Sequence, residues 1–161
     1  MTISFLLAIL ISIAHVHSIP VSTGIADSCD VDFSSSGSCT GTISISRECQ
    51  TAKLNLATTD ISTCTSVGLF WSYPTNNLTL TIGTPFTKKQ QAYQIEIDNK
   101  QFRGNIFHVY RIVNGQEIEV TTTDEKLVLN SDADFQIVLK LQGLPTTLSY
   151  GVFINYKVVK M

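Results

Sequence analysis

Ile106-Phe-His-Val-Tyr-Arg-Ile-Val-Asn-Gly115 is the stretch that decides the fold of this chain. Its first eight residues are apolar on both alternating phases, which is typical of a strand covered on both faces. An Asn-Gly dipeptide between two strand-like runs is a strong short-range signal of a β-hairpin. We therefore predict a central strand over 106–113 and a partner strand over 116–120, with Ile118 and Val120 facing inward.

The rest of the chain also alternates apolar and polar residues, in short runs separated by turn residues. Such alternation indicates strands with one buried and one solvated face. Further runs lie at 40–46, 53–56, 67–73, 78–82, 93–97, 127–129, 135–141 and 148–159. We predict an all-β fold, an antiparallel β-sandwich or jelly roll, as a single domain over 40–161. Residues 19–39, rich in Ser, Gly and Asp, are expected to be an irregular lead-in.

The first eighteen residues, MTISFLLAILISIAHVHS, contain an uncharged apolar run from Phe5 to Ala14. The run is shorter than the roughly 20 apolar residues that a membrane-spanning helix needs. It fits the apolar core of a secretory signal peptide, although no Lys or Arg precedes it. We predict a cleavable signal helix over 1–18, with cleavage after Ser18 and Ala26 as the alternative. The mature protein is then secreted and extracellular, with no membrane insertion after cleavage.

Charge and composition exclude one class of partner. The chain has eleven Lys and Arg against thirteen Asp and Glu, a net charge of −2, and all of them follow Ser18. The two signs alternate without blocks, and no basic stripe is visible. We therefore expect no nucleic-acid partner and no binding to anionic membranes.

The four cysteines are Cys29, Cys39, Cys49 and Cys64, and an even number in a secreted chain indicates disulfides. Their spacings of ten, ten and fifteen lack the close-set pairs of a zinc site. A strand between Cys39 and Cys49 would hold them about 30 Å apart, too far for a bond. Two pairings remain open. They are Cys29–Cys39 with Cys49–Cys64, which we prefer, and Cys29–Cys49 with Cys39–Cys64.

Catalytic constellations have little support in this sequence. His108 is the single histidine after Ser18, lies mid-strand, and has no Gly-x-Ser-x-Gly motif to accompany it. The carboxylate pairs Glu96 with Asp98 and Glu117 with Glu119 fall on outward strand phases, the parity of a solvated face rather than of a glycosidase site. We predict that the protein is not an enzyme and holds no cofactor and no metal.

Several polar and aromatic residues are candidates for contact with a partner. Trp71 and Tyr73 share the inward phase of their run, so core packing is the preferred interpretation, whereas Phe70 and Phe153 face outward. The loops to test first are 73–77, 84–89 and 130–134. Within the last, turn formation is preferred over a calcium loop, because Asp and Asn side chains bond nearby backbone N–H groups. The candidate contact residues are Phe70, Phe153, Tyr73, Asn130, Asp132 and Asp134.

Asn77-Leu-Thr79 is the only N-x-Ser/Thr sequon in the chain. Leu78 belongs to an inward phase, so Asn77 and Thr79 are expected to face outward after a turn. In a secreted chain this position predicts N-glycosylation of Asn77.

Three C-terminal segments resemble the CUB family, in particular the divergent CUB-like domains of nematode secreted proteins. The 106–115 stretch is similar to a strand and turn that read LxVYDG in CUB domains. Residues 127–141 look like the penultimate strand region, and Tyr150-Gly-Val-Phe-Ile-Asn-Tyr156 is similar to a closing GFxxxY strand. This chain departs from the pattern in two ways. All four cysteines precede Thr65, whereas CUB domains usually carry one disulfide in each half, and Asn105 stands near an expected calcium-binding Asp.

The resemblance implies a β-sandwich recognition module, found in extracellular or host-defence settings, without catalysis and with no calcium site that can be assigned. Together with the residues, it predicts a secreted, non-enzymatic extracellular binding domain, in a host-defence or host-interaction setting, for a protein or glycan partner. The alternative is a small secreted toxin, inhibitor or effector on a β-scaffold.

Overall fold

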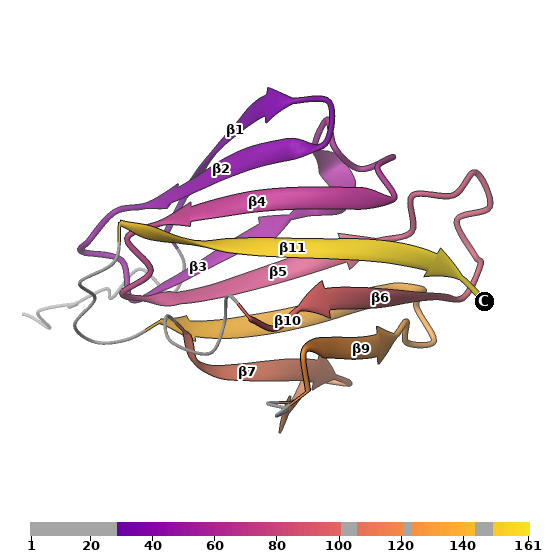
Figure 1. Ribbon diagram of the computed structural model, residues 1–161. Coiled ribbons are helices and arrows are strands. Elements are labelled where there is room, and N and C mark those ends of the chain that lie inside the picture. The colour runs from indigo at the N-terminus through magenta and orange to yellow at the C-terminus, as the bar shows by residue number, and fades with distance from the viewer. Residues whose placement is uncertain (1–28, 101–105, 121–123, 144–149) are drawn as a thin grey trace, which may run out of the picture.

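A computed structural model describes residues 29–100, 106–120, 124–143 and 150–161 (Figure 1). The predicted signal peptide, and the lead-in up to residue 28, lie outside these residues. The described chain forms two β-sheets, and its single helical element is one 3-10 turn, η1 (Leu56–Thr58). The predicted all-β sandwich is confirmed.

The six-stranded sheet has the order β1-β2-β4-β11-β6-β9. Its strands are β1 (Val31–Gly37), β2 (Thr40–Ile45), β4 (Ser66–Ser72), β11 (Gly151–Lys160), β6 (Tyr93–Asp98) and β9 (Lys126–Asn130). In Figure 1 the yellow β11 runs through the middle of this layer, between β4 and β6.

The five-stranded sheet has the order β3-β5-β10-β7-β8. Its strands are β3 (Thr51–Asn55), β5 (Asn77–Gly83), β10 (Gln136–Gly143), β7 (Ile106–Val113) and β8 (Gln116–Glu119).

The core lies between the sheets and is built by the alternating apolar residues of both. β11 buries Val152, Ile154, Tyr156 and Val158, and β10 buries every second residue as well. Trp71, Leu80 and Tyr93 are fully buried in the same cluster. Period-two patterning therefore predicted the buried set, because successive strand side chains point to opposite faces.

Two strand pairs depart from the antiparallel expectation. β2 pairs with β4, and β3 pairs with β5, in parallel. Each of these pairs is separated in sequence by a strand of the other sheet, so the connection is a crossover. Parallel neighbours need a crossover connection, which a hairpin cannot supply.

The predicted hairpin at Asn114-Gly115 is confirmed, but the central place of β7 was wrong. Asn114 (φ 51°) and Gly115 (φ 76°) both have positive φ, as a two-residue I′ turn requires. β7 is the second strand from the sheet edge, and its outward phase is only half-buried. Tyr110 on that phase is covered by a cation, the Lys140 ammonium 5.7 Å from its ring centroid, rather than by a second layer. At the edge, Ile118 faces the inner side yet remains 51% exposed.

The expectation of an irregular segment up to residue 39 was wrong as well, because β1 lies inside it and pairs antiparallel with β2. β1 is an edge strand with mostly exposed side chains, so it needs few apolar residues and shows little alternation. Backbone pairing, together with a disulfide at each end, holds it.

Those disulfides are Cys29–Cys49 and Cys39–Cys64, with Cα atoms 5.8 and 5.7 Å apart. Two disulfides are confirmed, but the preferred pairing was wrong. Cys29 precedes β1 and Cys39 lies in the turn after it, so a strand separates them by about 30 Å. The distance that excluded Cys39–Cys49 therefore also excludes Cys29–Cys39.

Candidate functional site

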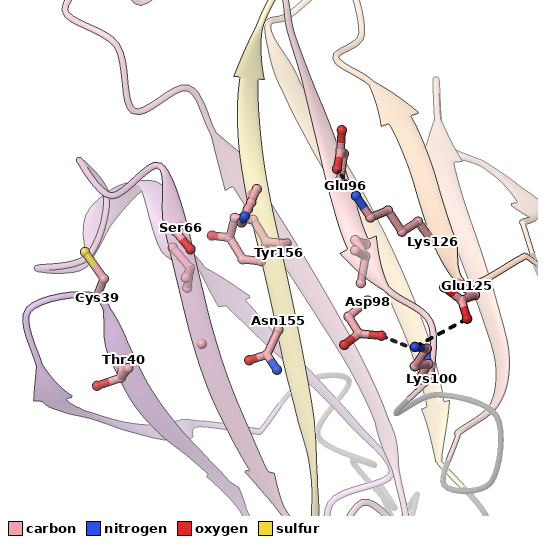
Figure 2. A pocket seen from close by; sticks show the side chains of 14 residues that line it. Cys39, Thr40, Ser66, Glu96, Asp98, Lys100, Glu125, Lys126, Asn155 and Tyr156 are labelled. Atoms are coloured by element: carbon pink, nitrogen blue, oxygen red, sulfur yellow. Dashed lines mark hydrogen bonds and ion pairs between the residues drawn. The ribbon is translucent and has the colours of Figure 1, made fainter.

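A hollow of about 500 Å³ lies on the outer face of the six-stranded sheet, and we call it the groove. Its outward-facing side chains come from β2, β4, β11, β6 and the start of β9, and from residues next to these strands (Figure 2). This volume is within the range of about 300–1,000 Å³ that small-molecule sites occupy. The residues that line it include Thr40, Gly68, Glu96, Asp98, Lys100, Glu125, Lys126, Asn155 and Lys157.

β4 has no side chain at the centre of the groove, because position 68 is a glycine. Gly68 pairs with Thr40 on one side and with Asn155 on the other. A Cβ on Gly68 would stand 3.2 Å from Asn155 Oδ1 and 3.6 Å from Thr40 Cγ2. The floor is therefore bare backbone between the Asn155 amide on one side and the Thr40 methyl group on the other.

The backbone beneath the groove is fully engaged in the sheet. β4 pairs with β2 and β11 on its two sides, and β11 pairs with β4 and β6. The Gly68 N–H also donates to the Cys39 carbonyl, at 3.0 Å. A ligand in the groove would therefore meet side chains rather than unpaired backbone groups.

The charged side chains of the groove are balanced, and four of the six form ion pairs. Lys126 Nζ donates to Glu96 Oε2 at 2.7 Å, and Lys100 Nζ lies 3.3 Å from Glu125 Oε1. The hydrogen bond from Lys126 holds the pKa of Glu96 below its usual value, and the same bond raises the pKa of Lys126. Asp98 and Lys157 complete the set, so three carboxylates face three ammonium groups.

Asp98 has a second role, because its Oδ1 accepts the backbone N–H of Lys100 at 3.0 Å (Figure 2). This bond turns the carboxylate along the end of β6 and fixes its orientation. Ile97 on β6 pairs with Tyr156 on β11, and the two strands are antiparallel. Asp98 and Asn155 are therefore opposite each other as well, and their side chains project from the same face of the sheet.

Two aromatic rings stand beside the groove on the same face. Phe153 precedes Asn155 by two residues on β11, a distance of about 7 Å along a strand. Phe70 lies directly opposite on β4, and the two ring centroids are 5.0 Å apart with planes tilted by 54°. Phe153 is 49% exposed, and Phe70 is half-buried. The outward placement predicted for both side chains is confirmed.

Tyr73 does not follow the predicted inward phase. β4 ends at Ser72, and Tyr73 turns away with φ 48° to an exposed position edge-on to Tyr150. The Arg47 guanidinium lies 5.5 Å from the Tyr73 ring centroid. Trp71, in contrast, is fully buried as predicted.

The three loops selected from the sequence do not form one surface. β5 and β10 are antiparallel, with Asn77 opposite Gln142 and Gly83 opposite Gln136. Loop 73–77 therefore lies at one end of the sandwich, and loops 84–89 and 130–134 lie at the other. Neither end includes the Phe70–Phe153 pair, which projects from the face of the sheet between them.

Loop 130–134 is a turn held together by Asp132, as the sequence indicated. Asp132 Oδ1 accepts the N–H groups of Asp134 and Gln136, both at 3.0 Å. The carbonyl of Asn130 accepts Arg111 Nη2 at 2.7 Å. These polar groups serve the local structure of the turn.

Glu117 and Glu119, the second carboxylate pair singled out from the sequence, lie on the outward face of the five-stranded sheet. Glu117 accepts Lys140 Nζ at 2.7 and 2.9 Å, and Glu119 Oε1 lies 2.6 Å from His108 Nδ1. Each carboxylate has a cationic or imidazole partner, which is the arrangement of a solvated face. In the part of the chain that the structure describes, no three metal-ligating side chains cluster, and no helix is long and apolar enough to cross a membrane.

Asn77 begins β5 on the outward phase of the five-stranded sheet, on the opposite side of the sandwich from the groove. Leu78 is fully buried, as the phase assignment predicted. Thr79 is only 9% exposed, because its neighbours across the sheet are Lys53 and Lys140, whose side chains are long.

Sequence reasoning missed most of the groove. Asp98 was recognised only as a solvated carboxylate, and Gly68, Asn155 and Lys157 were not selected. The usable signal was their shared outward phase, but phase does not tell which strands are neighbours. Only the order β2-β4-β11-β6 brings these residues together.

Comparisons with known proteins add little to this description. No protein-family model and no curated protein sequence matches the chain. Among solved structures, the chain is similar to the CUB1-EGF-CUB2 domains of rat MASP-1, with 15% sequence identity and a TM-score of 0.41. The match covers 69% of this chain and 43% of that chain. CUB is the family that the three C-terminal segments resemble, and no residue takes a role from this similarity.

Proposed function

We propose that this protein is a secreted, non-enzymatic recognition domain that binds an extracellular partner at the groove of the six-stranded sheet. The observation that carries the proposal is a hollow of about 500 Å³, floored by Gly68, with the exposed Phe153 ring and its partner Phe70 beside it. Concave sites that combine apolar surface with a few convergent polar groups are the usual form of a binding site.

Two further features support an extracellular setting. Both disulfides close within the described chain, and such bonds persist in oxidising compartments. The apolar run at the N-terminus, with the predicted cleavage after Ser18, would deliver the chain there. A glycan at Asn77 would lie over the five-stranded sheet and leave the groove accessible.

The chemistry of the groove favours binding over catalysis. Glu96, Asp98 and Glu125 each have a bonding partner in the described structure, and the described groove residues include no histidine. An acid–base pair would need two groups in different protonation states near neutral pH. Carboxylates that are already engaged with ammonium or backbone N–H groups suit recognition and orientation instead.

Binding to a panel of immobilised glycans and extracellular proteins tests this function. Full-length precursor is expressed in a secreting host, and the exported protein is compared with Lys157→Glu and Lys53→Glu. Lys157 lines the groove, whereas Lys53 lies on the outer face of the other sheet. We expect Lys157→Glu to weaken binding and Lys53→Glu to leave it unchanged.

Retention in the cell, failure to bind any member of the panel, or equal loss in both variants contradicts the proposal. One tight protein partner that neither charge reversal disturbs would favour the alternative, an inhibitor or effector that binds elsewhere on the scaffold.

A further inference from the structure

The charge balance of the groove bears on the nature of its ligand. Glu96 and Lys126 are joined at 2.7 Å, and Glu125 and Lys100 at 3.3 Å. A charged ligand would have to compete with these pairs, and the balanced groove produces no field of one sign to attract it. The arrangement favours a neutral ligand.

The polar groups that remain available are of mixed kind and closely set. Asp98 offers the carboxylate lone pairs that its bond to the Lys100 N–H leaves, and the Asn155 amide offers both donors and an acceptor. Neighbouring strands lie about 4.8 Å apart, so Asp98 and Asn155 present their groups to one small area. A hydroxyl group both donates and accepts, so a ligand with adjacent hydroxyls satisfies this set.

Phe153 supplies a flat apolar surface at the end of this polar row. The Phe70 ring packs against it at 5.0 Å and holds its orientation, while half of the Phe153 side chain remains exposed. A pyranose ring has an apolar C–H face that can lie on such a ring and an edge of hydroxyls. The juxtaposition of Phe153 with Asn155 and Asp98 matches these two sides.

An extended peptide fits the groove less well. Peptides that bind sheets commonly add a strand at an open edge, where unpaired backbone groups are available. The floor of the groove is formed by β4 and β11, whose backbones are paired on both sides. A peptide could gain no ladder of main-chain hydrogen bonds there.

We infer that the groove binds a neutral saccharide, with hydroxyls bonded to Asp98 and Asn155 and the C–H face of one sugar ring packed on Phe153. This inference rests on the proposed function and names the ligand class of the same site. Gly68 is the residue that admits the ring, because any side chain there would occupy the floor.

An array of neutral, sialylated and sulfated oligosaccharides provides the test, with the secreted protein and three variants. Phe153→Ala and Asn155→Ala should each weaken binding to neutral glycans about tenfold, as expected for the loss of roughly 1.4 kcal/mol of contact. Ile118→Ala removes an equally exposed apolar side chain from β8 and should have no effect. Fluorescence of Trp71, the single tryptophan and fully buried, verifies the fold of each variant.

The inference is supported if Phe153→Ala and Asn155→Ala lose neutral-glycan binding and Ile118→Ala does not. Binding only to sialylated or sulfated glycans, or neutral binding unchanged in Phe153→Ala and Asn155→Ala, overturns it. If no glycan binds while an extracellular protein binds in a manner sensitive to Lys157→Glu, the inference fails and the proposed function stands. If nothing binds, both fail.

Discussion

The ring of Phe70 packs against the ring of Phe153 across the β4–β11 pair, with centroids 5.0 Å apart. The Phe70 ring also covers Gly151, where a Cβ atom would collide with it. The large Phe70 side chain of β4 thus lies over Gly151 of β11, which has no side chain. The sheet face therefore carries a fixed aromatic platform beside the bare backbone of Gly68.

A double-mutant cycle on Phe70→Ala and Phe153→Ala should reveal coupling between the rings. Aromatic pairs contribute about 0.5–1.5 kcal/mol beyond their buried area, so the double variant should lose less stability than the two single losses added together. Urea unfolding followed by Trp71 fluorescence measures each term. Strict additivity would show that the two rings do not support each other in solution.

Removal of either disulfide should destabilise the protein to a similar extent. The bridges span 20 and 25 residues, and closure of loops this size contributes about 2–4 kcal/mol each. Cys29→Ser with Cys49→Ser, and Cys39→Ser with Cys64→Ser, are the two variants to compare by urea unfolding. A non-reducing peptide map of the native protein should contain only these two pairs, and a Cys29–Cys39 peptide would contradict the structure.

Gly143→Ala should be strongly destabilising. A Cβ at this position would overlap the Pro74 carbonyl oxygen and stand 3.0 Å from that of Asn76. Both are backbone atoms, and the Gly143 N–H donates to Asn76 O at 3.0 Å, which holds this segment against β10. We expect a loss of about 1–3 kcal/mol, typical of overpacking.

Gly37→Ala on the exposed strand β1 is the matched control for Gly143→Ala. Its nearest neighbour is the Thr40 side-chain hydroxyl at 3.0 Å, which can rotate away. The expected change in the free energy of unfolding is within about 0.5 kcal/mol. Equal losses in the two variants would count against the close approach of β10 to the 74–76 loop.

The protein should lose stability at alkaline pH through its two buried tyrosines. Burial raises the pKa values of Tyr93 and Tyr156 well above the ordinary 10.0. A raised folded-state pKa means that the stabilising contribution is complete below pH 10 and declines as the pH rises above it. Urea unfolding between about pH 8 and pH 11 measures the decline, and Tyr156→Phe should reduce it.

Tyr93→Phe should also lower stability at neutral pH. The Tyr93 hydroxyl donates to the Ile82 carbonyl at 2.6 Å in the core, and the loss of one partner leaves that carbonyl unpaired, at about 1–3 kcal/mol. Tyr150→Phe, at an 80% exposed position, is the control and should be neutral. A stable Tyr93→Phe variant would mean that water replaces the lost hydroxyl.

Local pattern predicted the strands because burial in a sheet has a period of two. The alternation of Ile95 with Glu96, or of Val152 with Phe153, assigned each residue to the core or the surface, and the structure agrees. The Asn114-Gly115 turn could also be predicted from local sequence, because it requires only that these two residues adopt positive φ angles. β1 was missed because an exposed edge strand of serines buries almost nothing.

The sequence by itself determined which side chains face inward, where the tight turn lies and how many disulfides form. Only the tertiary structure decided which strands are neighbours, and so which cysteines pair and which residues share the groove. Gly68, Asp98 and Asn155 come from three strands that are far apart in sequence. Phase is set by each strand alone, whereas adjacency depends on the pairing of whole strands across two sheets.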